Sequence, residues 1–333
     1  MAREPSRGVS RGEPVTVNPS KVLGGALLAA CLCLSSCSPA PPPALRVAAI
    51  AWPGYEPLFV AEAAGYLPPE QIQVVEQPAA SDVMHLLRNR TVEAGYLTLD
   101  EALTLISQGL ELNIVLIADR SRGADAVLVR PPRETLADLK GARVGVENTA
   151  VGALMLAEAL AHAGLGPTDI RMGFYPVNQH ERAYLDDEVD ALVTFEPVRS
   201  KLLAAGARQV FDSSRIPNRI LDVLAVRRDV AAAQAARLRT LITAHFRALE
   251  GLHDEAATAV IARHWHIPAS QVADRFLGLE LLGREDNRRL LEGTPSPLEL
   301  NARRLAEVMR GYQLLPGVLQ VSGLADPSHL PTD

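Results

Sequence analysis

The chain has 333 residues, of which 48% are hydrophobic and 22% are charged, a composition typical of one or two globular domains. Its 4% aromatic residues and 24 prolines do not approach the compositions of disordered, collagen-like or disulfide-scaffold proteins. The net charge of −6 argues against a nucleic-acid-binding protein, which normally carries a basic stripe that neutralises phosphates.

The first 36 residues have the pattern of an export signal. Basic residues precede an apolar run over residues 22–34, which is too short to cross about 30 Å of hydrocarbon as a helix. The tetrapeptide that ends at Cys37 resembles the lipobox of bacterial lipoproteins, in which the cysteine becomes the lipidated first residue. Cys31 ends a second match, and a plain secretory signal with incidental cysteines is the alternative. We prefer Cys37 because a stiff, proline-rich tether over residues 37–44 follows it. Since all three cysteines precede the tether, we expect neither disulfides nor thiol catalysis in the mature chain.

Beyond the tether, short apolar runs alternate with helical patterns, which predicts an α/β fold with largely parallel sheets. The predicted strands are 45–51, 73–76, 113–118, 126–129, 142–147, 169–174, 191–195, 209–211 and 221–226. The predicted helices between them are 55–63, 81–88, 99–107, 150–163, 180–185 and 197–205. From residue 230 to 314 the periodicity is helical, without a convincing strand. We find no internal repeat.

Two chain crossings predict two lobes. Arg130-Pro131-Pro132-Arg133 interrupts regular structure on both sides and is interpreted as a hinge. A second crossing is expected near residues 222–228. The predicted organisation is therefore a first lobe of residues 45–130 plus 223–333, which includes the C-terminal helices, and a second lobe of residues 131–222. Such a layout permits closure around a small ligand.

Five segments in order resemble the solute-binding proteins of the nitrate, sulfonate, taurine and thiamine-precursor ABC importers. They are AWPGYEPLFVAEAAGYL (51–67), VEAGYLTLD (92–100), SRGADA (121–126), LKGARVGVE (139–147) and VDALVTFEP (189–197). The resemblance covers about residues 45–250. It implies a two-lobed periplasmic-binding-protein fold of the second type with a helical C-terminal region, in which the ligand is held between the lobes and passed to a membrane permease. It also implies a monomer on the periplasmic or extracytoplasmic face, anchored by lipid.

The first predicted strand leads into an aromatic turn that contains Trp52, Gly54 and Tyr55. Ligands of open α/β sheets bind at the carboxyl ends of strands, so these rings could form one side of a binding site for a flat or cationic ligand. Packing in the core or at a rim is the alternative for both rings. Ser81 and Thr98 precede helical patterns and could present helix N–H groups to a ligand oxygen, or only cap the helices.

A second group of candidates follows the later strands. Glu147, Asn148 and Thr149 join a strand to a helix, with Thr149 as the expected cap. In sulfonate and nitrate relatives, the equivalent turn usually offers small hydroxyl residues to an oxyanion, and Glu147 departs from that pattern. Glu196 lies at the next junction between a strand and a helix.

Together with Asp125 and Asp222 near the crossings, these glutamates predict an acidic cleft. Such a cleft would favour a ligand that donates protons: an amine, an amidine or an N–H-rich heterocycle. Stabilisation by helix dipoles without any ligand is the alternative for Glu147 and Glu196. Arg120 and Arg122 support the opposite charge preference, because either side chain could extend into the cleft and bind an oxyanion.

The remaining motifs favour a binding protein without metal or cofactor. His264-Trp265-His266 resembles a metal motif, but histidines two residues apart lie on different faces of a helix. The alternative is an enzyme like the pyrimidine synthase that shares the fold and uses pyridoxal phosphate, a Schiff-base lysine and iron. Only Lys140 and Lys201 remain in the mature chain, which disfavours it. A periplasmic ligand sensor is a third possibility.

Overall fold

The computed structural model describes residues 12–13 and 43–332. The expected export segment, the lipidation candidates Cys31 and Cys37, and the first part of the tether lie outside the described residues. None of the helices in the described part of the chain is both long and apolar enough to cross a membrane.

The first sheet has six strands in the order β11-β4-β10-β3-β1-β2. Their bounds are Leu45–Ile50 (β1), Ile72–Gln77 (β2), Ala94–Thr98 (β3), Leu112–Ser121 (β4), Leu221–Arg227 (β10) and Leu279–Leu281 (β11). Strand β1 pairs in parallel with β2 and β3, whereas β10 runs antiparallel between β3 and β4. We call the elements around this sheet lobe 1.

The second sheet repeats this arrangement with five strands in the order β7-β6-β8-β5-β9. Their bounds are Ala126–Val129 (β5), Arg143–Val146 (β6), Arg171–Phe174 (β7), Ala191–Thr194 (β8) and Arg208–Asp212 (β9). Strand β6 pairs in parallel with β7 and β8, and β5 runs antiparallel between β8 and β9. We call the elements around this sheet lobe 2.

The structure corrects three expectations about the strands. Both sheets are mixed rather than largely parallel, because β5 and β10 are antiparallel to their neighbours. Strand β5 was expected in the first lobe but belongs to the second sheet, so the chain crosses at residues 122–125 rather than at Arg130–Arg133. Strands β3 and β11 were not predicted. All five residues of β3 are buried, so no alternation marks it, and β11 has three residues whose pairing with β4 is non-local.

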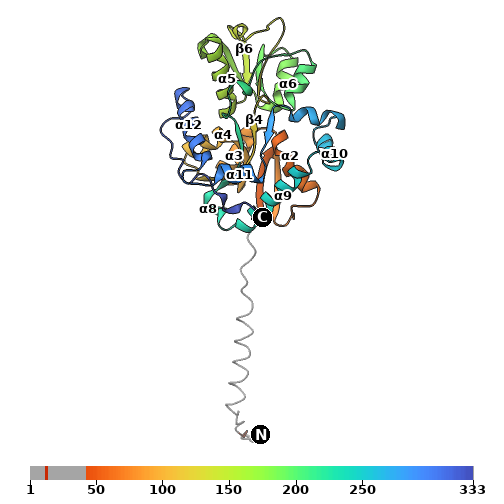
Figure 1. Ribbon diagram of the computed structural model, residues 1–333, viewed down its shortest axis with the longest axis vertical. Helices are drawn as coiled ribbons and strands as arrows, with labels where there is room; N and C mark the ends of the chain where they lie inside the picture. The colour runs from red at the N-terminus through yellow and green to blue at the C-terminus, as the bar shows by residue number, and fades with distance from the viewer. Residues whose placement is uncertain (1–11, 14–42, 333) are drawn as a thin grey trace, which may run out of the picture. The chain divides into compact units, whose positions relative to one another are not determined.

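Helices cover both sheets (Figure 1). The α-helices are Glu56–Ala63 (α2), Ala80–Arg88 (α3), Leu99–Ser107 (α4), Ala150–Ala163 (α5), Val177–Leu185 (α6), Val198–Ala204 (α7), Arg228–Ala231 (α8), Ala235–Glu250 (α9), Glu255–His264 (α10), Arg284–Leu291 (α11) and Pro297–Gly311 (α12). The 3-10 turns are Pro53–Tyr55 (η1), Leu136–Leu139 (η2), Pro167–Asp169 (η3), Ser213–Arg215 (η4), Ala269–Gln271 (η5), Ala273–Phe276 (η6) and Pro327–His329 (η7). The C-terminal helices pack on lobe 1, with α9 against α2 and α12 against α4.

Local sequence signals set the ends of several helices. Helix α5 begins after Thr149, whose hydroxyl accepts a hydrogen bond from the Gly152 N–H, and ends at Gly164, whose φ of 68° suits glycine. Helix α12 begins with a capping box between Ser296 and Glu299. The caps at Thr149 and Gly164 explain why a helix over residues 150–163 could be predicted with the observed bounds.

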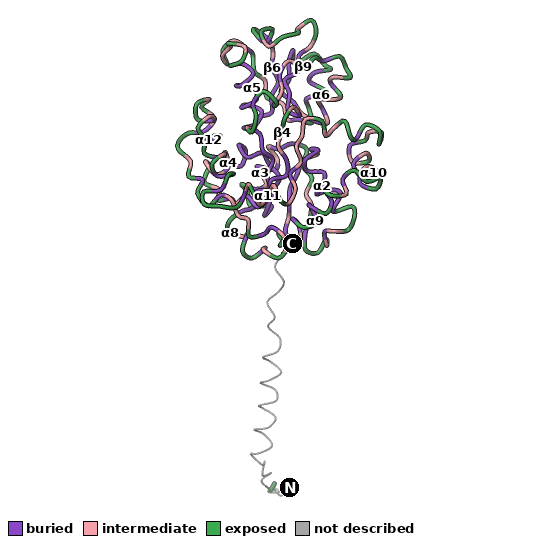
Figure 2. The backbone as a smooth tube through the Cα atoms, viewed as in Figure 1, coloured by how far each residue is buried: buried purple, intermediate pink, exposed green. Residues whose placement is uncertain are grey.

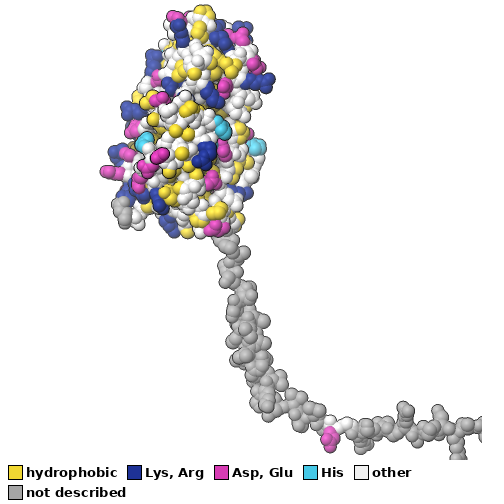
Figure 3. Space-filling view, turned by 90° about the vertical axis from the view of Figure 1, so that its right-hand side faces the viewer, with side chains coloured by type: hydrophobic (Ala, Val, Ile, Leu, Met, Phe, Trp, Pro, Cys, Tyr) yellow, Lys and Arg dark blue, Asp and Glu magenta, His cyan; other side chains and the backbone are white. Residues whose placement is uncertain are grey.

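The core follows from strands that are buried on both faces, drawn as purple segments in the middle of Figure 2. In β5, Val127 and Val129 pack on the side of α5, whereas Ala126 and Leu128 pack on the other face of the sheet. On the outside, charged side chains of both signs are interspersed over the face drawn in Figure 3.

Candidate functional site

A cavity lies between the two sheets; its free volume is about 20 Å³, or about 350 Å³ when all the space around it and the solvent at its mouth are included. Its walls come from Ile50, Trp52, Tyr55, Ala80, Tyr96, Thr98, Glu101 and Asp222 in lobe 1, Val151 and Phe195 in lobe 2, and Asp125 in the crossing between them. Ile50 and Thr98 end strands β1 and β3, so the cavity lies at the sheet edge where α/β proteins bind ligands. Among the lining residues are the first residue of α3, Ala80, the second residue of α5, Val151, and the N-cap of α4, Thr98.

The aromatic turn after β1 holds two buried carboxyl groups. The Trp52 indole donates from Nε1 to Asp119 Oδ2 at 3.1 Å, and the Tyr55 hydroxyl donates to Asp222 Oδ1. Asp119 and Asp222 are directly opposite each other on the antiparallel strands β4 and β10. Burial raises the pKa of Asp119 to about 7 and that of Asp222 well above its usual range. The pair is therefore expected to share a proton near neutral pH.

Gly54 lets the turn approach this pair. A Cβ at that position would lie 1.6 Å from Asp119 Oδ2 and 2.9 Å from Trp52 Nε1. A side chain would therefore displace the carboxyl group that Trp52 holds. The geometry explains a glycine at this point of the aromatic turn.

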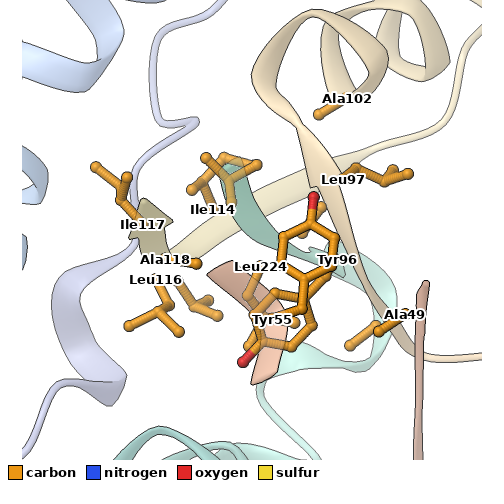
Figure 4. Packing of buried hydrophobic residues seen from close by; sticks show 14 of the residues in the cluster. Ala49, Tyr55, Tyr96, Leu97, Ala102, Ile114, Leu116, Ile117, Ala118 and Leu224 are labelled. Atoms are coloured by element: carbon orange, nitrogen blue, oxygen red, sulfur yellow. The ribbon is translucent and has the colours of Figure 1, made fainter. Parts of the chain in front are cut away.

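Two pairs of aromatic rings line the cavity. The ring of Tyr55 lies 5.0 Å from that of Tyr96 (Figure 4), and the Tyr96 hydroxyl is 3.0 Å from His245 Nδ1. Burial lowers the pKa of His245 to about 3, so its imidazole is neutral. Trp52 packs edge-to-face against Phe195 of lobe 2, with the ring centroids 5.5 Å apart. The aromatic contact thus joins the two lobes.

Three carboxyl groups in the cavity wall each keep an oxygen without a hydrogen-bond partner. These are Glu101 Oε1, Asp125 Oδ2 and Asp222 Oδ2. Burial raises the pKa of Glu101 to about 7 and that of Asp125 to about 6. Among the described residues, the cavity wall contains no Lys, Arg or His. The site is therefore acidic, and the Thr98 hydroxyl, which can donate or accept, also lines it without a hydrogen-bond partner.

Glu147 links the lobes but is not part of the cavity wall. Its Oε1 accepts long hydrogen bonds, each 3.4 Å, from the N–H and hydroxyl of Ser81 in α3. Burial, together with the nearby charge of Glu101, raises the pKa of Glu147 to about 8. Ser81 was expected just before the helix but is the second residue of α3, whose N-cap is Ala79.

Glu196 is held by other protein groups. It accepts hydrogen bonds from Arg199 at 3.1 Å and from the Ser200 hydroxyl at 2.8 Å. Arg275, from the C-terminal region, approaches it at 3.9 Å. These contacts explain its complete burial and leave it outside the cavity wall.

The structure thus brings together part of the predicted site. Trp52, Tyr55, Thr98, Asp125 and Asp222 line the cavity, and Gly54 lies directly behind it. Ser81, Asn148 and Thr149 line a neighbouring groove between α3 and α5, where Asn148 is exposed and Thr149 caps α5. Arg120 and Arg122 both pair with Glu280 outside the cavity.

Sequence reasoning missed Glu101, Asp119 and Tyr96. Glu101 could have been found, because Thr98 and Glu101 have the spacing of a capping box, and Glu101 Oε2 accepts from the Thr98 N–H at 3.0 Å. Asp119 and Tyr96 lie within buried strands, and no local signal separates them from core residues.

His264 proves to be part of an ion-pair cluster. Its Nδ1 lies 2.8 Å from Glu56 and its Nε2 lies 3.1 Å from Glu76, while His266 is exposed beyond the end of α10. Burial alone would lower the pKa of His264, but the two carboxylates raise it to about 9. Within residues 12–13 and 43–332, no three His, Cys, Asp or Glu side chains form a metal-binding cluster.

Comparisons with known proteins give a consistent result. The model of the NMT1-like family matches residues 38–265. A protein of Escherichia coli K12 described as binding aliphatic sulfonates is 25% identical over 210 residues, which span 62% of this chain and 66% of that protein. The match therefore spans slightly less than two thirds of that relative's length.

Solved structures show the same fold. The alkanesulfonate-binding protein SsuA from Xanthomonas axonopodis pv. citri, bound to MOPS, has a TM-score of 0.70 at 20% identity, and the match covers 87% of this chain and 99% of that chain. The desulfurization enzyme DSZB has a TM-score of 0.60 at 18% identity, with 87% and 98% covered. Binding proteins and an enzyme thus share this architecture, so the fold by itself does not decide between them.

Proposed function

Because the chain belongs to the NMT1-like family, among the substrate-binding proteins of the nitrate, sulfonate and taurine ABC importers, we propose that it is an extracytoplasmic receptor that delivers a small molecule to such an importer. Its two-lobed, mixed α/β architecture is that of the type II periplasmic binding proteins. Its partners in this proposal are the membrane subunits of the importer, and it works as a monomer.

The observation that carries this proposal is the cavity between the lobes. Its walls come from both sheets, so a ligand there would hold the lobes together. The lobes are joined by two chain segments, between β4 and β5 and between β9 and β10. Opening about these segments would release the ligand.

The acidic wall supports a ligand that contains an amine or an N-heterocycle. Carboxylates in a buried site repel anions and accept hydrogen bonds from N–H groups. Asp125 and Asp222, both singled out from the sequence, lie in this wall. An oxyanion such as nitrate, a sulfonate or taurine is the alternative, supported by the relatives named above.

Binding without turnover is favoured over catalysis by the positions of the lysines. Lys140 is exposed at the end of η2, and Lys201 pairs with Glu181 on the surface of α7. Neither is placed to form a Schiff base with a molecule in the cavity. A periplasmic sensor would use the same cavity and differ only in its membrane partner.

A thermal-shift screen of the purified protein tests the receptor function. The panel contains cationic and N-heterocyclic metabolites beside nitrate, sulfonates and taurine. A solute present at a hundredfold excess over its Kd should stabilise the folded protein by about 2.7 kcal/mol. The proposal requires that at least one solute raises Tm and that Trp52→Ala, which removes a wall of the cavity, abolishes the shift. A panel without any such solute would contradict it.

The lipid anchor is a separate part of the proposal, with its own test. We propose that Cys37 carries the lipid on the extracytoplasmic side of the membrane. Cys37→Ala should release the protein from the membrane fraction, whereas the matched variant Cys31→Ala should leave it there. Release by Cys31→Ala alone would move the anchor to that residue.

A further inference from the structure

Three elements far apart in the chain place unsatisfied acceptors in one cavity. Glu101 belongs to α4, Asp125 to the crossing between the lobes and Asp222 to β10. Their exposed fractions are 1%, 5% and 2%, and each keeps one oxygen without a hydrogen-bond partner. A buried polar atom without a partner costs free energy, more so when it is charged. A ligand with N–H donors would remove this cost.

At two of the helix starts beside the cavity, the route by which a helix terminus binds an oxyanion is already occupied. At the start of α4, the Thr98 N–H donates to Glu101 Oε2. At the start of α3, the Ser81 N–H donates to Glu147. At these two starts, protein carboxyl groups thus take N–H groups that would otherwise attract an anionic ligand, whereas at α5 the Thr149 hydroxyl accepts from the Gly152 N–H.

The nearby arginines are also engaged elsewhere. Arg199, whose charge acts on Asp125, donates to Glu196 and to Gln209 at 2.9 Å. Arg120 and Arg122 share Glu280. The carboxyl groups of the cavity therefore have no protein cation of their own among these arginines.

The aromatic residues of the wall favour a flat group. Trp52, Tyr55, Tyr96 and Phe195 line the cavity together with the acidic residues. Planar cations with several N–H donors stack on aromatic rings and match the two oxygens of a carboxylate. An ammonium group is a compact, strongly hydrated charge and uses such walls less well.

We propose that the cavity takes a small organic cation with an amidinium or guanidinium group, whose N–H donors are accepted by Glu101 and Asp125. This inference rests on the proposed receptor function and specifies the ligand class for the same cavity. The aromatic rings pack on the flat faces of the cation, while the carboxyl groups accept at its edges.

Binding of such a cation is coupled to proton release. In the empty protein, burial raises the pKa values of Glu101 and Asp125 to about 7 and about 6, so both are partly protonated near neutral pH. A cation favours their ionised forms. The other titratable or charged groups that act on Glu101 and Asp125 are Tyr55, Asp100, Asp119, Glu147, Arg199 and Asp222.

Matched probes of one shape test the charge preference. We would measure binding of benzamidine, benzamide and benzenesulfonate, and of the smaller acetamidine, acetamide and methanesulfonate, by calorimetry with the purified protein. The amidines should bind about tenfold or more tightly than the neutral amides, because charge-assisted hydrogen bonds are lost in the amides. Titrations at pH 6.5 in buffers of different ionisation enthalpy should show proton release on amidine binding.

Isosteric variants give a readout that does not need a ligand. Glu101→Gln and Asp125→Asn remove buried charge without changing shape, so each should raise the Tm of the empty protein at pH 8 while weakening amidine binding about tenfold. If these carboxylates served only as structural hydrogen-bond partners, the same substitutions would lower the Tm of the protein. Glu181→Gln, in an exposed ion pair with Lys201, is the matched control and should change neither property.

The outcomes separate this inference from the receptor function. Amidine binding that is weakened about tenfold in each variant supports both proposals. Binding of a sulfonate but of no amidine overturns the cation and leaves the receptor. A lower Tm in both variants at pH 8 also contradicts the proposal that the ligand is a cation, whichever probe binds. Amidine binding without proton release contradicts the assignment of Glu101 and Asp125 as acceptors.

Discussion

Gly54 and Asp119 show how closely packed the site is at the level of single residues. The glycine has no room for a Cβ, because the carboxyl group that Trp52 holds would lie 1.6 Å away. Asp119 is fully buried and faces Asp222 across two strands, so it has little freedom to move aside. The aromatic turn and the carboxyl pair therefore form one packed unit.

Gly54→Ala should lower the free energy of unfolding by about 1–3 kcal/mol, because the added methyl group overpacks a fully buried site. Chemical denaturation of the empty protein measures this loss. Gly311→Ala is the control, since a Cβ at Gly311, the last residue of α12, meets nothing within 4 Å. Equal effects of the two substitutions would contradict the packing described here.

His264 should titrate far above an ordinary histidine, because Glu56 and Glu76 bind both ring nitrogens. Its folded pKa of about 9 lies above its unfolded value, so its stabilising contribution is complete below about pH 6.5 and is lost as pH rises through 9. His264→Gln should therefore cost about 1–2 kcal/mol at pH 6 and much less at pH 9.5.

Denaturation curves at the two pH values check this prediction, and NMR titration of the imidazole locates the pKa directly. The exposed His266 provides the matched variant, His266→Gln, which should show no such difference between the two pH values. An imidazole pKa near 6.5 for His264 would show that the two carboxylates do not hold it.

At the scale of elements, each sheet contains the same contact between an arginine and a carboxylate on two parallel strands, which we call a strand clamp. Arg46 at the start of β1 donates to Glu93 just before β3 through its backbone and side chain, at 2.9 and 2.6 Å. Arg143 at the start of β6 makes the same contacts with Asp190 just before β8, at 2.8 and 2.9 Å. Each clamp fixes the register of two parallel strands and thereby the strand ends that form the cavity.

Asp190→Asn should destabilise the protein by about 1–2 kcal/mol at pH 7, because it weakens charge-assisted hydrogen bonds to Arg143 that are partly exposed to solvent. Those bonds lower the pKa of Asp190 to about 2, so its contribution is present above about pH 4 and is lost as pH falls towards 2.

Denaturation at pH 7 and pH 2.5 tests the strand clamp. Asp187 also contacts Arg143, at 3.3 Å, but its side chain is 69% exposed. Asp187→Asn should therefore change the stability by less than about 0.5 kcal/mol. A penalty for Asp190→Asn that persists at pH 2.5 would contradict the ionic origin of the clamp.

At the scale of the molecule, the buried carboxyl groups should set the pH dependence of stability. Glu101, Asp119, Asp125 and Glu147 have folded pKa values between about 6 and about 8, all above their unfolded values. Their stabilising contribution is complete below about pH 4 and is lost as pH rises through these values. The acids of the two strand clamps, Glu93 and Asp190, act in the opposite direction at lower pH. We therefore expect the free energy of unfolding to be highest near pH 4 to 5.

Between pH 5 and 8, the free energy of unfolding of the empty protein should fall, by about 1.4 kcal/mol per pH unit for each carboxyl group that is protonated only in the folded state. Denaturation at several pH values measures the slope. The double variant Glu101→Gln, Asp125→Asn should flatten it. A stability that rises over this range would contradict the burial of these groups as ionisable residues.

The sequence by itself determined which segments form most strands and helices, the family, and the place of the aromatic turn. Hydrophobic periodicity and capping residues act within a few positions, so helices such as α4 and α5 could be predicted residue by residue. The family resemblance rests on short segments in a fixed order, which also needs no knowledge of contacts.

Only the tertiary structure decided which acids share the cavity. Glu196, a predicted ligand contact, is surrounded by Arg199, Ser200 and Arg275, whereas Glu101 keeps a free oxygen in the wall. Asp119 and Asp222 meet because β10 returns antiparallel beside β4. Whether a carboxyl group is paired or free depends on neighbours from distant parts of the chain, and local sequence does not carry that information.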